Sequence, residues 1–323
     1  MPADGGMVNI NAPYQQEFYD CRKFREVKKV VKALVKQNRK EGFFTKPSPV
    51  AFKWKTDSES SVLEISEDRD FSSPICHTLN KNEAEIYNLK KDAKYFWRVN
   101  GCEAFTFVTD STPPRWIYAD GCVNIRDIGG EKTADGKTVR QGLAFRGTRL
   151  EDDLTENGKS ALLDLGIKTE IDLRREAVGK VTGSPLGGDV RYISHPCNGY
   201  DDFLLKDSPE DIKKLIEYFA DEENYPIYFH CKGGADRTGT LAFLLGAIFG
   251  LDDSTLIRDY ELTMCCSPEK KMSRSRKKKI KEFLKILHKR DKNKTLAENT
   301  VDYLYGCGVE KETAEKIRSI FLY

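Results

Sequence analysis

A cysteine and an arginine lie six positions apart on either side of a glycine pair, at Cys231 and Arg237. An apolar run, 227–229, precedes them, and a strongly apolar stretch, 241–249, follows. This order predicts a strand, a short loop and the N-terminus of a helix. Backbone N–H groups at such a turn bind anions, so the segment is typical of a site that holds a phosphate and attacks it.

Attack by Cys231 requires a thiolate, although a free cysteine titrates near about 8.5. The expected helix N-terminus and nearby positive charge both lower that pKa. Arg237 offers a planar fork that can contact two phosphate oxygens. Gly233 and Gly234 allow the positive φ angles that an inward-curled loop needs. The expected phosphate-binding residues are Lys232, Gly233, Gly234, Ala235, Asp236, Arg237 and Thr238.

Two neighbours of this loop are expected to support the reaction. Thr238 can donate its hydroxyl to the Cys231 sulfur and help the sulfur leave, whereas His230 is expected to orient the loop rather than transfer protons. The chemistry then has two steps. Cys231 attacks phosphorus to form a phosphocysteine while a carboxylic acid protonates the leaving oxygen, and water then hydrolyses the thiophosphate.

The same spacing has a second interpretation, in which a buried cysteine merely lies near a surface arginine. A cysteine and an arginine six positions apart occur often by chance, so the spacing does not decide. The preceding strand, the glycine pair, the Arg237-Thr238-Gly239 ending and the apolar helix favour the catalytic interpretation.

The loop reads His-Cys-x-x-Gly-x-Asp-Arg-Thr-Gly and resembles that of the cysteine-dependent protein tyrosine phosphatases. It is most similar to a bacterial branch with dual-specificity and phosphoinositide-hydrolysing members. Four further segments resemble family motifs, and together they cover roughly residues 112–323: 123–130, 145–150, 165–174 and 259–263. The resemblance implies hydrolysis of phosphotyrosine, and of phosphoserine or phosphothreonine as a wider specificity, with no metal and no cofactor.

The resemblance also implies a substrate that is a phosphoprotein or a phosphoinositide. Members with lipid activity often carry a lysine just before the loop aspartate, where this chain has Ala235, which weakens the phosphoinositide alternative. A third alternative is a phospho-ligand binding module without turnover. Such modules usually lack the cysteine or the arginine, and both are present here.

The general acid is less well determined. Related phosphatases carry an aspartate on a mobile loop about 30 residues before the nucleophile, and such loops act as lids. Asp201 and Asp202 lie at that distance, after a predicted strand over 190–193 and a flexible Asn198-Gly199 pair. Alternatively, both aspartates belong to a solvent-exposed segment that leads into a helix and have no role in catalysis. Asp236, inside the loop beside Arg237, is the rival candidate, and it could instead hold the loop by an ion pair.

Strands and helices are expected to alternate from about 115 to 250, which indicates an α/β catalytic domain with a mostly parallel central sheet flanked by helices. Helices are expected over 156–165, 208–220 and 238–249, and the tail over 253–323 is expected to be helical. The paired prolines at Pro113-Pro114 mark where this domain begins. The predicted division is 1–45, 46–111 and 112–323.

The first 111 residues predict a smaller β-rich part. Residues 1–14 are expected to be disordered, and 16–40 to form an amphipathic helix that packs on a neighbouring surface. Strands are expected over 52–54, 62–65 and 95–99. The stretch 86–99 resembles a fibronectin type III domain, which implies a small β-sandwich with Tyr95 as its corner tyrosine and Trp54 in its core.

Composition limits the class of protein. No apolar run approaches the roughly 20 residues of a membrane span. No signal-peptide pattern is found at the start, although removal of a leader peptide stays an open alternative. The nine cysteines are odd in number and lack the spacing of a disulfide framework, which favours a reducing cytoplasm. His195 and Cys197 have no further ligand pair, so no metal site is expected.

Charge is unevenly distributed along the chain. Residues 270–294 carry thirteen Lys or Arg against two acids, a local charge of +11 in a chain of +2. Nucleic acid is not expected as a partner, because Phe283 is the only aromatic residue in this segment. Ile280, Phe283 and Leu287 share helical spacing, so a helix docked by that face with its lysines in water is favoured. Contact with an anionic substrate or membrane surface remains the alternative.

Overall fold

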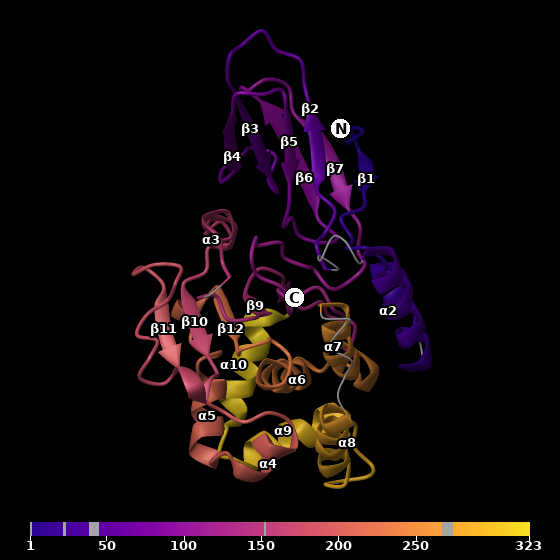
Figure 1. The fold of residues 1–323 in the computed structure, drawn as a ribbon, viewed down its shortest axis with the longest axis vertical. Helices are drawn as coiled ribbons and strands as arrows, with labels where there is room; N and C mark the ends of the chain where they lie inside the picture. The colour runs from indigo at the N-terminus through magenta and orange to yellow at the C-terminus, as the bar shows by residue number, and fades with distance from the viewer. Residues whose placement is uncertain (1, 22–23, 39–44, 152, 267–273) are drawn as a thin grey trace.

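The computed structural model describes residues 2–21, 24–38, 45–151, 153–266 and 274–323. Figure 1 shows an upper, β-rich part formed by the N-terminal strands and a lower part in which helices surround a second sheet. The lower part contains the loop of Cys231.

The upper part contains a five-stranded sheet in the order β1-β7-β6-β3-β4 and a two-stranded sheet, β2-β5. Buried side chains between them include Phe52, Leu63, Trp97 and Phe107. The predicted strands over 52–54, 62–65 and 95–99 correspond to β2, β3 and β6. The bounds are β1 Gly6–Val8, β2 Val50–Lys53, β3 Ser61–Ser66, β4 Ile75–Leu79, β5 Glu83–Ile86, β6 Lys94–Val99 and β7 Phe105–Thr109.

Two features implied by the fibronectin type III resemblance can be compared with the structure. Tyr95 is buried, and its hydroxyl accepts a hydrogen bond from the Lys90 backbone N–H at 2.9 Å, as a corner tyrosine would. The core tryptophan, however, is Trp97 rather than Trp54, which is only half-buried. Trp54 follows the last residue of β2 and packs at the margin of the core, where its Nε1–H donates to the Ser61 hydroxyl at 3.1 Å. The family assignment of this part stays a prediction.

The expectation of disorder over residues 1–14 is wrong for the strand β1. Gly6, Met7 and Val8 pair in parallel with Phe107, Val108 and Thr109 of β7. The partner lies about 100 residues away, and a three-residue strand that begins with a glycine carries no local periodicity that could predict the pairing. This pairing also crosses the predicted division between 1–45 and 46–111.

The helix expected over 16–40 is two helices, α1 Gln15–Tyr19 and α2 Phe24–Asn38. Arg258 donates to the carbonyls of Phe18 and Cys21 at 3.0 Å each and so binds the end of α1. Phe18, Cys21, Val27 and Val31 pack with Trp116, Leu262 and Cys265, which confirms a core-facing role. The side chains of Phe24 and Leu34 lie outside those described.

The lower part confirms the predicted α/β architecture. Its sheet has the order β11-β10-β12-β9-β8, and only β8 is antiparallel to its neighbour. Parallel strands end at the same edge of a sheet, so β9, β10 and β12 deliver Thr148, Leu173 and Cys231 to one edge. The bounds are β8 Arg126–Asp127, β9 Ala144–Gly147, β10 Thr169–Asp172, β11 Arg191–Ser194 and β12 Ile227–His230.

Helices cover this sheet, and those predicted over 156–165, 208–220 and 238–249 are confirmed as α3, α5 and α6. The predicted helical tail is α7 to α10, whereas the short helix α4 was not predicted. The bounds are α3 Glu156–Leu163, α4 Asp201–Lys206, α5 Pro209–Glu217, α6 Arg237–Phe249, α7 Asp253–Cys266, α8 Arg274–His288, α9 Leu296–Gly306 and α10 Lys311–Phe321, with short 3-10 turns at Arg175–Ala177 and Glu222–Asn224.

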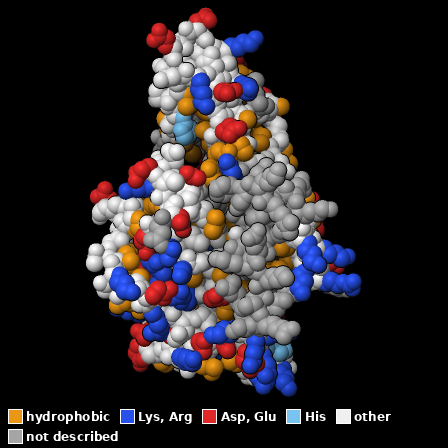
Figure 2. Space-filling view, viewed as in Figure 1, with side chains coloured by type: hydrophobic (Ala, Val, Ile, Leu, Met, Phe, Trp, Pro, Cys, Tyr) orange, Lys and Arg blue, Asp and Glu red, His pale blue; other side chains and the backbone are white. Residues whose placement is uncertain are grey.

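The basic segment forms most of α8, which docks by its apolar face as predicted. Ile280, Phe283 and Leu287 are buried, and the Phe283 ring packs edge-on against Tyr200 and Phe243. Figure 2 shows a group of Lys and Arg side chains at the lower end of the molecule, where Figure 1 places α8. The side chains of 270–277 lie outside those described.

Among the described residues, no helix is long and apolar enough to cross a membrane.

Candidate active site

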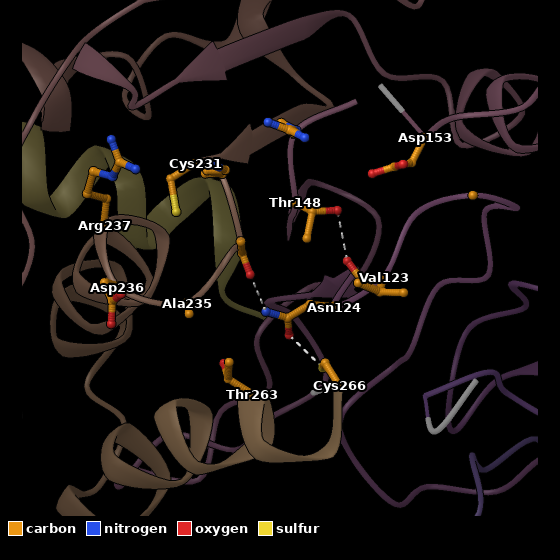
Figure 3. A pocket seen from close by; sticks show the side chains of 14 residues that line it. Val123, Asn124, Thr148, Asp153, Cys231, Ala235, Asp236, Arg237, Thr263 and Cys266 are labelled. Carbon is orange, nitrogen blue, oxygen red and sulfur yellow. Dashed lines mark hydrogen bonds between the residues drawn. The ribbon is translucent and has the colours of Figure 1, made fainter. Parts of the chain in front are cut away.

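Cys231 lies where β12 ends at His230, and α6 begins at Arg237. Its side chain is buried at the base of a cavity of about 480 Å³. Figure 3 shows Cys231 and Arg237 on one side of this cavity, with Asn124, Thr148, Thr263 and Cys266 on the other. The predicted strand, loop and helix are thus present, and the loop forms the wall of a pocket.

The first half of the loop is held by Asn124, which lines the cavity, and by the buried Arg146. The Asn124 side-chain amide donates to the carbonyls of Gly233 at 3.2 Å and Gly234 at 3.0 Å. Arg146 also donates to the Gly234 carbonyl, at 2.7 Å. Carbonyls that are bound from outside leave the N–H groups of a curled loop to face inward, where an anion would sit.

The second half of the loop is held by Tyr200 and Thr240. The Tyr200 hydroxyl donates to the Ala235 carbonyl at 3.0 Å, and the Thr240 hydroxyl donates to the Asp236 carbonyl at 2.9 Å. The Tyr200 backbone N–H in turn donates to the Thr240 hydroxyl at 2.7 Å. All four loop carbonyls from Gly233 to Asp236 therefore have hydrogen-bond donors from other parts of the chain.

Only one of the two loop glycines adopts a positive φ. Gly234 has φ 61°, and a Cβ there would approach the Gly147 carbonyl oxygen to 2.5 Å. Gly233 is not among the positive-φ residues, and a Cβ there would meet nothing within 4 Å. The expectation that both need this conformation is wrong for Gly233, because the curl is completed by Gly234 alone.

The pKa of the Cys231 thiol lies below that of an ordinary cysteine. Burial alone would raise the pKa, but the Thr238 hydroxyl, the Thr238 and Gly233 backbone N–H groups and the Arg237 charge favour the thiolate and prevail. The Thr238 hydroxyl is buried and makes no hydrogen bond to nitrogen or oxygen among the described residues, so the sulfur is its natural acceptor. These influences are those predicted from the sequence.

Arg237 is held by Glu176, a residue that the sequence did not single out. Nη1 of Arg237 donates to Glu176 Oε2 at 2.8 Å, and Nη2 donates to Oε1 at 3.0 Å. The hydrogen bond to Arg237 lowers the pKa of Glu176 to about 2. A guanidinium has five N–H donors, and Glu176 accepts from one on each Nη. The remaining N–H groups, which include Nε–H, can therefore bind a second anion.

Glu176→Gln should therefore weaken the site without removing any group that contacts phosphate. We expect the activity constant kcat/KM to fall about ten- to a hundredfold, because the Arg237 plane loses its fixed orientation. Vanadate inhibition should weaken in parallel. Steady-state kinetics on Glu176→Gln and on the exposed control Glu210→Gln measure this effect, and equal activity of the two variants would exclude Glu176 as a positioning residue.

His230 is fully buried behind the loop, as expected for an orienting residue. Its Nε2 lies 2.8 Å from Glu170 Oε1, and its Nδ1 lies 3.3 Å from the Cys231 carbonyl oxygen. Burial opposes the charged imidazole, but the hydrogen bond and charge of Glu170 prevail and raise the pKa of His230. Neither ring nitrogen is directed to the cavity.

Two buried arginines and one aspartate connect the loop to α7. Arg126 donates from Nε and Nη2 to Asp259 Oδ1, at 3.0 and 2.9 Å, and from Nη1 to Asn124 Oδ1 at 2.6 Å. Arg146 pairs with the other oxygen of Asp259. Burial and the neighbouring Arg126 lower the pKa of Arg146 to about 10, with Asp259 acting against them. Asp259 thus keeps both arginines in place behind the loop.

Asp259→Asn should destabilise the fold by about 3–5 kcal/mol, since it leaves two buried guanidinium groups without a counter-charge. Denaturant unfolding of the reduced protein measures this difference. A free energy of unfolding within about 1 kcal/mol of the wild type would show that the arginines find other partners.

Two further acids make structural ion pairs. Asp127 pairs with Arg115 at 2.9 Å and accepts from two backbone N–H groups. Asp172 pairs with Arg174 at 2.6 Å at the end of β10. Both carboxylates are fully buried away from the sulfur.

The three candidate acids occupy different places. Asp236 lines both the cavity of Cys231 and a neighbouring cavity of about 430 Å³. Asp202 lines only the neighbouring cavity, where Lys206 and Lys279 pair with it and lower its pKa. Asp201 lines neither of these two cavities. Asp153, which the sequence did not indicate, lines the wall opposite Cys231.

The segment expected to be a lid packs against the outer side of the loop. Asn198 binds Asp207 through its backbone N–H at 2.8 Å and its side-chain amide at 2.6 Å. A Cβ on Gly199 would lie 3.2 Å from the Arg237 backbone nitrogen. Tyr200 is buried. In this structure the segment supports the loop instead of covering the cavity, and the acid roles of Asp201 and Asp202 stay predictions.

Six residues of the site were not predicted from the sequence: Asn124, Arg146, Asp153, Glu176, Tyr200 and Asp259. Asn124, Arg146 and Asp259 fall inside three of the family-like segments, so position within a motif was their available signal. Glu176 and Tyr200 carried no local signal, because their role depends on contacts with the loop. Among the described residues, no group of three His, Cys, Asp or Glu could hold a metal ion.

Comparison with known proteins adds a family match. A family model described as tyrosine phosphatase family matches residues 117–323. A tyrosine-protein phosphatase from Nostoc commune is 25% identical over an alignment of 131 residues, which covers 34% of this chain and 45% of that protein. The match thus spans less than half the length of this curated relative.

Two solved structures are also similar. The core catalytic domain of the PP-IP phosphatase SIW14 from S. cerevisiae, in complex with citrate, has 14% identity and a TM-score of 0.33, covering 50% of this chain and 94% of that one. Another structure of the Siw14 catalytic core has 16% identity, a TM-score of 0.34 and the same coverage.

Proposed function

This chain belongs to the tyrosine phosphatase family, and from that premise we propose that it hydrolyses phosphotyrosine through a phosphocysteine formed on Cys231. The observation that supports this most is the buried Cys231 thiol, whose pKa is lowered beside Arg237 at the base of a cavity. The proposal includes phosphoserine and phosphothreonine as further substrates.

In the first step the Cys231 sulfur attacks phosphorus, and the bond from phosphorus to the leaving oxygen breaks. Inward N–H groups of the loop and the free edge of Arg237 hold the three non-bridging oxygens. In the second step a water oxygen attacks phosphorus and the sulfur leaves as a thiolate. The Thr238 hydroxyl donates to that sulfur, and inorganic phosphate is released.

Asp236 is proposed as the acid that protonates the leaving oxygen and then accepts a proton from the attacking water. Of Asp201, Asp202 and Asp236, it is the one that lines the Cys231 cavity. It is also the N-cap residue of α6, next to Arg237, so it is anchored to the phosphate site itself.

The test of the acid compares Asp236→Asn with Asp201→Asn, Asp202→Asn and Asp153→Asn. With an alkyl phosphate, a poor leaving group, Asp236→Asn should lose about 10²–10⁴-fold in kcat and the fall in rate at alkaline pH. With para-nitrophenyl phosphate the loss should be much smaller. The same pattern in one of the other three variants would move the acid role to that residue.

A phosphoinositide substrate is the second candidate, supported by two further cations at the cavity, Arg149 and Lys232. Phosphate release from a phosphotyrosine peptide and from a soluble phosphoinositide, measured at equal concentration, separates the candidates. Higher kcat/KM on the phosphoinositide would replace the first proposal. If the pure, reduced protein turned over neither these substrates nor para-nitrophenyl phosphate, the third alternative, a binding module, would stand.

The basic segment over 270–294 is proposed to attract an anionic substrate. Lys279 on α8 lines the cavity next to Arg237, where it pairs with Asp202. A helix with exposed lysines at this position raises the local concentration of anions, an effect that salt screens.

A further inference from the structure

The N-terminal part has a feature that phosphate hydrolysis leaves unused: its strand β4, Ile75–Leu79, is an open sheet edge. β4 pairs only with β3, on one side, among the described strands. It contains no lysine, proline or bulge, the devices by which proteins usually block such an edge. Its other edge therefore offers free backbone N–H and C=O groups.

A cleft of about 580 Å³ lies against the inner face of this edge. Ile75 and His77 of β4 line it on one side, and Ala161 of α3 and Asp164, the C-cap residue of that helix, line it on the other. Figure 1 shows β4 on the outer edge of the upper part with α3 below it. Both parts of the chain thus contribute to the cleft, and the family match begins only at residue 117.

Apolar and aromatic side chains form the floor of the cleft. Ile75 keeps 45% of its surface exposed, and Nε2 of His77 is buried with no hydrogen-bond partner among the described residues. An unsatisfied buried nitrogen at the wall of a cleft indicates a place for a polar ligand atom. The floor comprises Ile86, Leu89, Tyr95, Leu143, Phe145 and Leu165.

The uncompensated charge of the cleft is negative. Glu67 is paired with Lys90 at 2.8 Å, and Arg115 with Asp127 at 2.9 Å. Glu85 and Asp164 make no ion pair among the described residues.

Lys46 contacts the aromatic wall of the cleft and shows what that wall accepts. Its Nζ lies 4.2 Å from the ring centre of Tyr118 and 4.9 Å from that of Tyr87. The chain's own lysine thus uses the cation–π contact that such rings offer to positive groups.

We propose that this edge and cleft bind an extended, lysine-containing peptide segment of a partner protein, which adds to β4 as a further strand. Backbone hydrogen bonds to β4 supply the register, and alternate side chains of the peptide enter the cleft. The lysines on that face lie near Glu85 and Asp164, with their methylene stems over the apolar floor. The site lies at the N-terminal end of β9, away from the edge that carries Cys231, so it can be occupied during catalysis.

The probe is a labelled seven-residue peptide with alternating threonine and lysine, blocked at both ends, and the readout is fluorescence anisotropy with the full chain. We expect saturable binding. The same peptide with glutamate for lysine, and a version with N-methyl groups on its backbone, should not bind. Equal binding of either control, or no binding of the probe, would overturn the proposal.

The matched variants are the double change Glu85→Lys with Asp164→Lys, and the control Glu103→Lys on an exposed turn outside the cleft. The double variant should bind the probe at least about tenfold more weakly, because like charges then face each other. The control should bind as the wild type does. Turnover of para-nitrophenyl phosphate checks that both are folded. Unchanged binding by the double variant would contradict the proposal.

A second copy of this chain could occupy the same edge instead. Sedimentation velocity of the wild type and of Ile75→Lys distinguishes the two occupants. The proposal expects a monomer in both cases. A wild-type dimer that Ile75→Lys separates would assign the edge to self-association and overturn the peptide proposal.

Discussion

Cys231→Ser should abolish phosphatase turnover, with a fall of about 10⁴-fold or more in kcat, because a serine hydroxyl remains protonated where the thiol ionises. The substitution keeps the size and the hydrogen bonds of the side chain. The loop carbonyls stay held by Asn124, Arg146 and Tyr200, so the anion cradle should remain. Binding of inorganic phosphate should therefore change by less than about tenfold.

Hydrolysis of para-nitrophenyl phosphate and calorimetric titration with phosphate measure the two effects separately. Cys102→Ser, at an exposed cysteine of the upper part, is the matched control and should behave as the wild type. Loss of phosphate binding together with turnover would assign Cys231 a structural role.

Arg237→Lys should also be severely damaging on every phosphate ester, although it preserves the charge. An ammonium cannot offer the planar fork that contacts Glu176 and a phosphate oxygen pair at once. We expect kcat/KM to fall about 10²–10³-fold, the range for loss of one preorganised donor in a transition state. Phosphate affinity should fall as well, which distinguishes this variant from Cys231→Ser.

Arg175→Lys is the matched control, because Arg175 lies nearby, is exposed and pairs with Asp207. Steady-state kinetics and phosphate titration on both variants give the comparison. Near-normal activity of Arg237→Lys would mean that Arg237 contributes only charge and that another donor binds the transferring group.

The strand, loop and helix around Cys231 were predictable because the pattern is local. An apolar strand, a glycine pair and a long apolar helix follow one another within about 25 residues, and each has a short-range cause. The pairing of β1 with β7 was not predictable, since it depends on a partner about 100 residues away. The core position of Trp97, where Trp54 was expected, likewise depends on packing between strands that a local pattern does not specify.

The candidate site divides in the same way. Residues inside the loop follow from the spacing, whereas Glu176 and Asp259 act on it from other elements. Asp202 illustrates the limit of arguing from distance along the chain. Its position before the nucleophile matched the expected acid, yet it pairs with Lys279 of α8 and lines the neighbouring cavity. The direction of a side chain on a helix depends on packing that a position in sequence does not specify.

The central claim is that Cys231 carries a thiolate within an anion-binding loop. The most direct measurement is the rate at which iodoacetamide alkylates each cysteine as a function of pH, with peptide mapping and with phosphate present or absent. Cys231 should react with a midpoint below that of an ordinary thiol, about 8.5, since thiolate accumulates as pH rises through a lowered pKa, and phosphate should slow it. A midpoint at or above that of the exposed Cys102, with a rate that phosphate leaves unchanged, would contradict the account.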